Sequence, residues 1–165
     1  MSSVISRKSF LFLSFNTSAG LLIGTSALAQ DPPPKAAPLD KDLVKEFVVK
    51  SHSDLGRVKE LYSQQPGLLN CSWDWGGGDF ETGLEAAGHV GNKQIAQFLL
   101  DHGARLNIFC AAMLGKMDIV KSMLTAFPDL KNSKGPHGLQ LLHHAKKGGD
   151  AAANVLQYLE SVGAQ

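Results

Sequence analysis

The stretch GLEAAGHVGNKQIAQFLLDHGARLN, residues 83–107, decides the fold of this chain. It predicts two short amphipathic helices that are separated by a glycine turn and followed by a glycine stop. The second helix has apolar residues at helical spacing, namely Ile95, Ala96, Phe98, Leu99 and Leu100. Gly103 follows where a left-handed residue is expected, because glycine has no Cβ to clash there. Such a helix pair cannot bury its apolar face alone, so it predicts that neighbouring pairs stack against it.

Three other segments of the chain align with this one. In the segment that starts at Ile108, Ala111 and Gly115 have the same four-residue offset as Ala87 and Gly91. A later segment, residues 140–163, repeats the pattern if two residues are inserted within 149–153. The first segment, residues 53–70, is the most degenerate, and its end at 66–70 matches residues 128–132. The chain therefore contains about four copies of one helix-pair unit.

The unit resembles a known repeat family. The run Thr82-Gly83-Leu84-Glu85-Ala86-Ala87, followed by Gly91-Asn92, Leu99-Leu100, Gly103-Ala104 and Asn107, resembles the ankyrin repeat, whose period is about 33 residues. The run Leu141–Ala145 resembles a second copy of its opening segment.

The resemblance covers roughly residues 42–165 and implies an all-α fold. That fold would be an ankyrin-repeat solenoid of about four stacked helix-turn-helix repeats, with irregular or missing hairpin fingers. Gly83 and Glu85 stand where the family has proline and histidine, and no room is left for a finger after Asn107. The alternative is an unrelated bundle of four to eight helices.

The N-terminal residues are typical of an export signal. Arg7 and Lys8 precede an apolar stretch, and Ala27-Leu28-Ala29 resembles a cleavage site, so residues 1–29 are interpreted as a signal peptide. The segment around Arg7 resembles the bacterial twin-arginine signal, but the lysine leaves the general secretory route open. The alternative is an uncleaved membrane anchor. Residues 30–41 would then be a proline-rich linker, residues 42–165 the repeat domain, and the mature chain periplasmic or secreted and free of the membrane.

The charge of the chain and its two cysteines limit the classes of function and of covalent cross-link that we expect. Removal of residues 1–29 would leave 14 basic and 15 acidic residues, since only Arg7 and Lys8 are lost from the 16 basic ones. A near-neutral chain argues against nucleic-acid binding, which needs a basic surface. In an oxidising compartment Cys71 and Cys110 could form a disulfide, but we expect both thiols to remain unpaired.

The repeat domain is expected to be a monomer.

The segment SWDWGGGDFE, residues 72–81, is the strongest candidate for a partner-binding site. In the ankyrin family such fingers often contact partners, and this finger is longer than usual. Its aromatic residues would supply affinity and its acidic residues would set polarity. These residues are Trp73, Asp74, Trp75, Asp79, Phe80 and Glu81. The alternative is that the tryptophans fold back over the gap left by a missing finger.

The concave groove of the repeats is the second candidate. The resemblance implies that His89, Val90, Met113 and Leu114 face it, and His52 occupies the matching place in the first segment. The alternative is that Met113 and Leu114 pack against neighbouring helices.

Sites for metals or catalysis are not expected. The six histidines show no H-x-x-x-H spacing, the cysteines no C-x-x-C spacing, and several histidines lie in separate repeats or loops. No nucleophile, base and orienting group occur in a recognisable pattern. We therefore expect no metal, no cofactor and no enzyme, but a non-catalytic protein–protein interaction module. The alternatives are an assembly or stability factor for an envelope enzyme and, with less support, an enzyme or a metal-binding protein.

Overall fold

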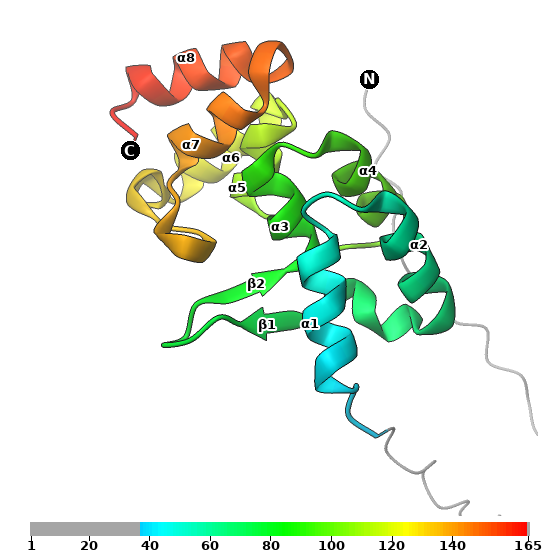
Figure 1. Cartoon of the computed structure of the whole chain (residues 1–165). Coiled ribbons are helices and arrows are strands. Elements are labelled where there is room, and N and C mark those ends of the chain that lie inside the picture. Colours follow the sequence, from blue (N-terminus) through cyan, green and yellow to red (C-terminus); the bar gives the residue numbers. More distant parts are fainter. Residues whose placement is uncertain (1–36, 165) are drawn as a thin grey trace, which may run out of the picture. The chain divides into compact units, whose positions relative to one another are not determined.

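The computed structural model describes residues 37–164, which are mostly helical (Figure 1). The α-helices are α1 Lys41–Lys50, α2 Leu55–Gln64, α3 Gly83–Val90, α4 Lys93–Asp101, α5 Ile108–Met113, α6 Met117–Ala126, α7 Leu141–Lys147 and α8 Ala153–Ser161. Four short 3-10 helices are η1 Pro66–Asn70, η2 Pro128–Asn132, η3 Pro136–Gly138 and η4 Gly149–Ala152. Strands β1 Ser72–Asp74 and β2 Phe80–Thr82 form an antiparallel hairpin. The expected signal peptide and most of the expected linker lie outside the described residues.

The helices predicted from residues 83–107 are confirmed as α3 and α4. Thr82 caps α3 in a capping box with Glu85, so that each side chain satisfies a backbone N–H at the helix start. Gly91 ends α3 with a φ of 81°, and Asn92 caps α4 by accepting from the backbone N–H of Ile95. Gly103, with a φ of 93°, follows the end of α4 as predicted.

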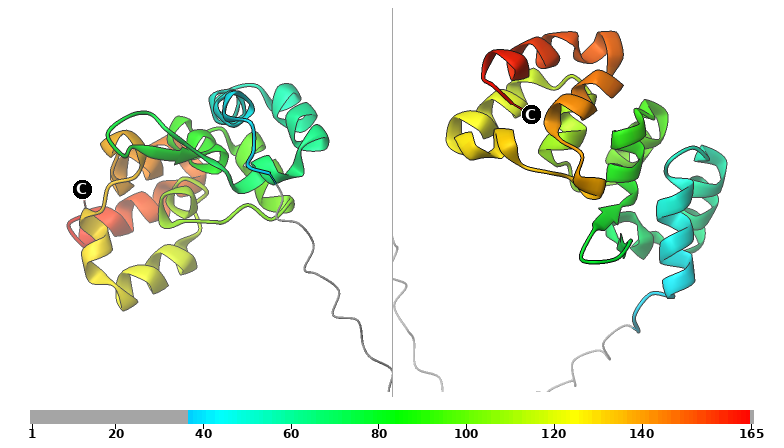
Figure 2. Two further views of the ribbon diagram at one scale, coloured as in Figure 1. Left: turned by 90° about the horizontal axis from the view of Figure 1, so that it is seen from below. Right: turned by 60° about the vertical axis from the view of Figure 1, so that its left-hand side comes forward.

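Helices that follow one another pack as pairs: α1 with α2, α3 with α4, α5 with α6 and α7 with α8. The first helices of the pairs also contact one another in chain order, from α1 through α3 and α5 to α7. Figure 2 shows this row of pairs from two further sides. Polar groups join neighbouring pairs as well. Asn70 donates to the carbonyl of Gly103, 33 residues away, and Asn107 donates to Glu85.

Two apolar clusters form the core, and α5 belongs to both. Cys110 and Met113 lie in the first cluster, which is built mainly from α1 to α4. The other four residues of α5 lie in the second cluster with α6, α7 and α8. All six residues of α5 are buried, so this helix connects the two halves of the core.

The segments between the helices differ from one another. The two matching segments 66–70 and 128–132 form η1 and η2, and η4 covers residues 149–152 of the segment where the sequence comparison places a two-residue insertion. No strand occurs among the described residues between α4 and α5, whereas Lys134 and Gln140 form an isolated bridge before α7. Among residues 37–164, no helix combines the length and the apolar composition needed to cross a bilayer.

Candidate functional site

The hairpin determines which finger residues face inward. Trp73 pairs with Glu81, and Asp74 pairs with Phe80, across the two strands. Because opposite residues of an antiparallel pair share one side, Trp73 and Glu81 lie on one face and Asp74 and Phe80 on the other. Strand β1 packs on α1, and Glu81 is fully buried, whereas Phe80 is 58% exposed. The hairpin therefore carries one carboxylate into the protein and leaves one phenylalanine outside.

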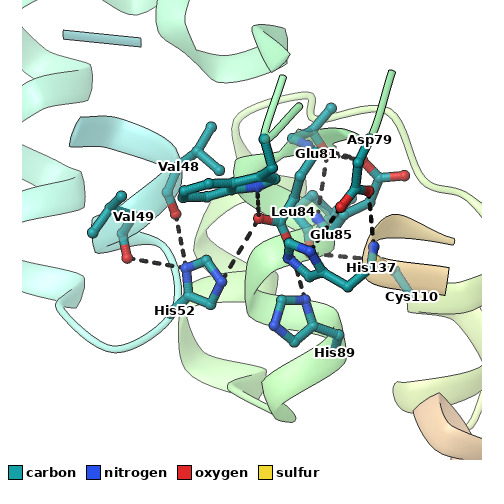
Figure 3. A network of polar contacts seen from close by, with 12 residues as sticks. Val48, Val49, His52, Asp79, Glu81, Leu84, Glu85, His89, Cys110 and His137 are labelled. Atoms are coloured by element: carbon teal, nitrogen blue, oxygen red, sulfur yellow. Dashed lines mark hydrogen bonds and ion pairs between the residues drawn. The ribbon is translucent and has the colours of Figure 1, made fainter. Parts of the chain in front are cut away.

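Three histidines surround the buried Glu81 carboxylate (Figure 3). Nδ1 of His89, in the last turn of α3, lies 2.9 Å from Oε1. Nε2 of His137, in η3, lies 3.5 Å from Oε1, and Nε2 of His52, after α1, lies 3.7 Å from Oε2. The indole N–H of Trp75 donates to Oε2 at 2.8 Å. The four side chains around Glu81, three histidines and one tryptophan, thus come from four separate segments of the chain.

In His52 and His137, the ring nitrogen that points away from Glu81 lies close to hydrogen-bond acceptors. Nδ1 of His52 lies 3.1 Å from the carbonyl of Val48 and 3.0 Å from that of Val49. Nδ1 of His137 lies 2.9 Å from Oδ2 of Asp79. Since carbonyl and ionised carboxylate oxygens only accept, both Nδ1 atoms carry the proton, and Nε2 is the nitrogen turned toward Glu81.

The inner atoms of this cluster are incompletely satisfied. Oε1 of Glu81 and Nδ1 of His89 are buried without a hydrogen-bond partner among the described residues, because the angle of their 2.9 Å contact is outside hydrogen-bond geometry. Burial opposes ionisation of Glu81, but the neighbouring His89, the hydrogen bond from Trp75 and the nearby His52 outweigh it and hold the pKa of Glu81 below its usual value. The carboxylate of Glu81 is therefore enclosed by three imidazoles and one indole.

These contacts correct two expectations from the sequence. Glu81 is not an exposed acid available to a partner, because the strand register turns it inward. The histidines are not dispersed: the rings of His52 and His89 are 4.9 Å apart and those of His89 and His137 are 5.2 Å apart. Stacking of α1 on α3, and the return of the chain at η3, bring them together.

The other expected finger residues divide between the surface and the fold. Asp74, Trp75 and Phe80 are exposed, with Trp75 at 38%. Trp73 is half-buried, with Lys45 Nζ 5.4 Å from its ring centre. Asp79 is bound to the backbone N–H and the ring of His137. Both tryptophans thus contact the protein, and of the two only Trp75 is also exposed.

The expected groove residues also divide. Val90 is 38% exposed, but the side chain of His89 is only 12% exposed. Met113 is fully buried in the first apolar cluster, so its expected place on the groove is wrong. Leu114 is half-buried and lines a different hollow, together with residues of α2 and α4. Packing against neighbouring helices, the alternative for Met113, is confirmed.

Both cysteines are free thiols in the structure. Cys110 lies under α3, where its thiol donates to the carbonyl of Leu84 at 3.3 Å. Burial raises the pKa of Cys71 to about 11 and that of Cys110 to about 12. Burial thus disfavours the thiolate, which is the nucleophilic form, at both cysteines.

No family model matches the chain, and no match is found among the curated proteins or the solved structures.

Proposed function

We propose that this chain is an exported, non-catalytic protein-interaction module with an ankyrin-like stack of helix pairs. Its partner would be a protein that places an apolar side chain against Phe80, on the outer face of the β1–β2 hairpin. The observation that carries the proposal is the 58% exposure of Phe80 on a hairpin whose other face is fixed to the protein. A rigid aromatic side chain at the surface gives a partner apolar area at little entropic cost.

The arrangement of the helices supports the ankyrin-like part of the proposal. Four helix pairs follow one another, and the first helices are in contact in chain order. The Asn70–Gly103 hydrogen bond joins residues one repeat length apart, and Asn92 likewise donates to the carbonyl of His52 in the preceding unit. Nearest-neighbour contacts of this kind are the usual construction of repeat proteins.

The surroundings of Phe80 support a binding role. Phe80 lines a shallow hollow together with Phe109, Pro136 and Lys134. The hollow lies between the hairpin and the segment that contains η3, so a partner side chain could contact both. Asp79, Glu85 and Lys134 also line this hollow, and Asp74 is exposed on the same face of the hairpin. The proposed surface therefore combines one exposed aromatic ring with charged groups that could pair with polar groups of a partner.

The state of the cysteines supports a role without catalysis. Both thiols have raised pKa values, and Cys110 is fully buried. The export part of the proposal depends on the sequence of residues 1–29 alone.

The test is affinity capture from a cross-linked extract of cells that express the chain, with Phe80→Ala compared against wild type. Phe80 is the preferred site because Trp75 and Trp73 also contact Glu81 and Lys45, so their loss would disturb the fold. Phe127→Ala is the matched control, since Phe127 is 66% exposed but lies after α6, away from the hairpin.

Both substitutions are expected to change stability by less than about 0.5 kcal/mol, because they alter exposed side chains. A protein captured by wild type and Phe127→Ala but lost with Phe80→Ala would support the proposal. Its affinity for purified Phe80→Ala should be weaker by about 30-fold, the usual effect of a hot-spot residue. Equal capture by all three proteins would refute the hairpin as the binding site.

A further inference from the structure

We propose that His52, Glu81, His89 and His137 form a binding site for one divalent transition-metal ion, for which zinc is the best fit. One ligand atom from each residue lies within 4.8 Å of the others, and Glu81 is fully buried. Three imidazole nitrogens and one carboxylate oxygen are the donor set of a four-coordinate zinc centre. This inference is independent of the proposed partner site at Phe80.

The spacing of the donor atoms fits a metal ion. A tetrahedral zinc ion with bonds of about 2.1 Å holds neighbouring ligand atoms roughly 3.4 Å apart. Oε1 of Glu81 lies 2.9 Å from Nδ1 of His89 and 3.5 Å from Nε2 of His137, and all four ligand atoms lie within 4.8 Å of one another. Small side-chain adjustments would therefore bring all four donors to bonding distance.

The outer hydrogen bonds already select the required nitrogens. Carbonyls of Val48 and Val49 fix the proton of His52 on Nδ1, and Asp79 does the same for His137. In each ring the remaining nitrogen, Nε2, has its lone pair toward the cluster. Metal-binding histidines have such an acceptor behind the ring, because it fixes the tautomer and raises the basicity of the ligand.

A metal ion also resolves the two orphaned atoms. Oε1 of Glu81 and Nδ1 of His89 face each other without hydrogen-bond geometry, and each is buried. The indole N–H of Trp75 already donates a hydrogen bond to Oε2 of Glu81, so Oε1 is the oxygen that is available to bind the metal ion. A single cation bound by all four donors would satisfy both of these buried atoms.

Bound metal would connect three parts of the fold. His52 follows α1, Glu81 and His89 belong to β2 and α3, and His137 lies in the segment before α7. Because all four ligands come from protein, the site has the closed shell of a structural metal site. Its expected effect is to stabilise the base of the hairpin against α1 and η3.

The test is zinc titration of the untagged full-length chain after removal of metal with a chelator. Isothermal calorimetry should show one site, and Co²⁺ should give the visible d–d absorption of a tetrahedral centre. His52→Gln, His89→Gln and His137→Asn should each weaken zinc binding more than about a hundredfold, since loss of an outer partner alone costs about 10- to 100-fold. Asparagine is chosen at residue 137 because that residue has a φ of 58°, which asparagine tolerates.

Three further variants make the test specific. Asp79→Asn, which alters only the acceptor behind His137, should weaken binding by the smaller factor of about 10 to 100. His102→Gln is the matched control, because His102 is an exposed histidine outside the cluster. Phe80→Ala should also bind zinc like wild type, which separates this site from the proposed partner site.

Folding of each variant is checked by circular dichroism. His137→Asn changes a side chain that is 35% exposed, so it remains informative if a variant nearer the core fails to fold. Zinc should raise the melting temperature of wild type and His102→Gln but not that of His137→Asn. Absence of stoichiometric zinc binding, or equal affinity in wild type and His137→Asn, would overturn the proposal and leave the cluster as a network of polar contacts.

Discussion

His144 should make the stability of the domain depend on pH. Its side chain is fully buried in α7, beside the ring of Phe109, and its Nε2 has no hydrogen-bond partner within residues 37–164. Burial, assisted by the nearby His143 and His89, lowers the pKa of His144 to about 4 from 6.5, although its hydrogen bond with Gln140 acts in the opposite direction. The folded protein therefore holds this imidazole neutral at a pH where the unfolded chain protonates it.

The sign and size of the effect follow from proton linkage. The contribution of neutral His144 to the free energy of unfolding is fully present above the unfolded pKa of 6.5. It is lost as the pH falls toward the folded pKa of about 4, because the unfolded state then binds one more proton than the folded state. Each pKa unit corresponds to about 1.4 kcal/mol, so His144 should cost roughly 2 kcal/mol at pH 5 and roughly 3 kcal/mol below pH 4.

The assay is urea unfolding at pH 7 and pH 5, with chelator present so that metal occupancy does not change. His144→Leu is the comparison, because leucine fills the apolar site but does not titrate. Wild type should lose about 2 kcal/mol more than His144→Leu between the two pH values, while contributions from the other histidines cancel in the difference. Equal losses in the two proteins would show that His144 is not held neutral by burial.

Two further predictions concern the contacts between helix pairs. Gly91→Ala should destabilise the domain more than Gly103→Ala, by about 1 kcal/mol or more, because both residues have positive φ but only a Cβ at Gly91 would meet the Lys147 carbonyl, at 2.6 Å. Thermal unfolding of both variants measures the difference, and equal destabilisation would argue against close packing at Gly91. Asn107→Ala should cost about 1–3 kcal/mol, because it removes both the cap of α5 and the hydrogen bond to Glu85. Urea unfolding tests this, and a change below about 0.5 kcal/mol would show that water replaces both bonds.

Local signals in the sequence were enough to predict the helices. These signals lie within one helix pair: the cap at Thr82, the glycine that ends the helix at Gly91 and the apolar spacing of residues 95–100. They can therefore be recognised without knowledge of how the other pairs pack. The repeated offsets then predicted which helices correspond to one another.

The histidine cluster depends on contacts between units, and the sequence shows only part of it. His52 and His89 occupy matching places in adjacent units, so stacking of those units brings their rings together. That alignment was the available signal, whereas H-x-x-x-H spacing detects ligands only on a single helix. Glu81 depends on the register of the hairpin, and His137 on the path of an irregular segment, and neither has a local sequence pattern.

Met113 shows why an exposed position was predicted for a buried side chain. The resemblance places it at the groove, but its side chain is fully buried in the first apolar cluster, with residues of the preceding helix pairs. This burial depends on contacts between pairs, which the sequence around Met113 does not show.

Helix α5 determines how the domain opens. It has no outer surface, and its residues are shared between two apolar clusters. It cannot separate from one cluster without exposing part of the other, so its amide hydrogens should exchange with solvent only when most of the domain unfolds. Among the described elements, α1 and α8 stand at the two ends of the row of pairs, so each can fray by itself. A chain assembled from local pairs therefore has a cooperative centre and less cooperative ends.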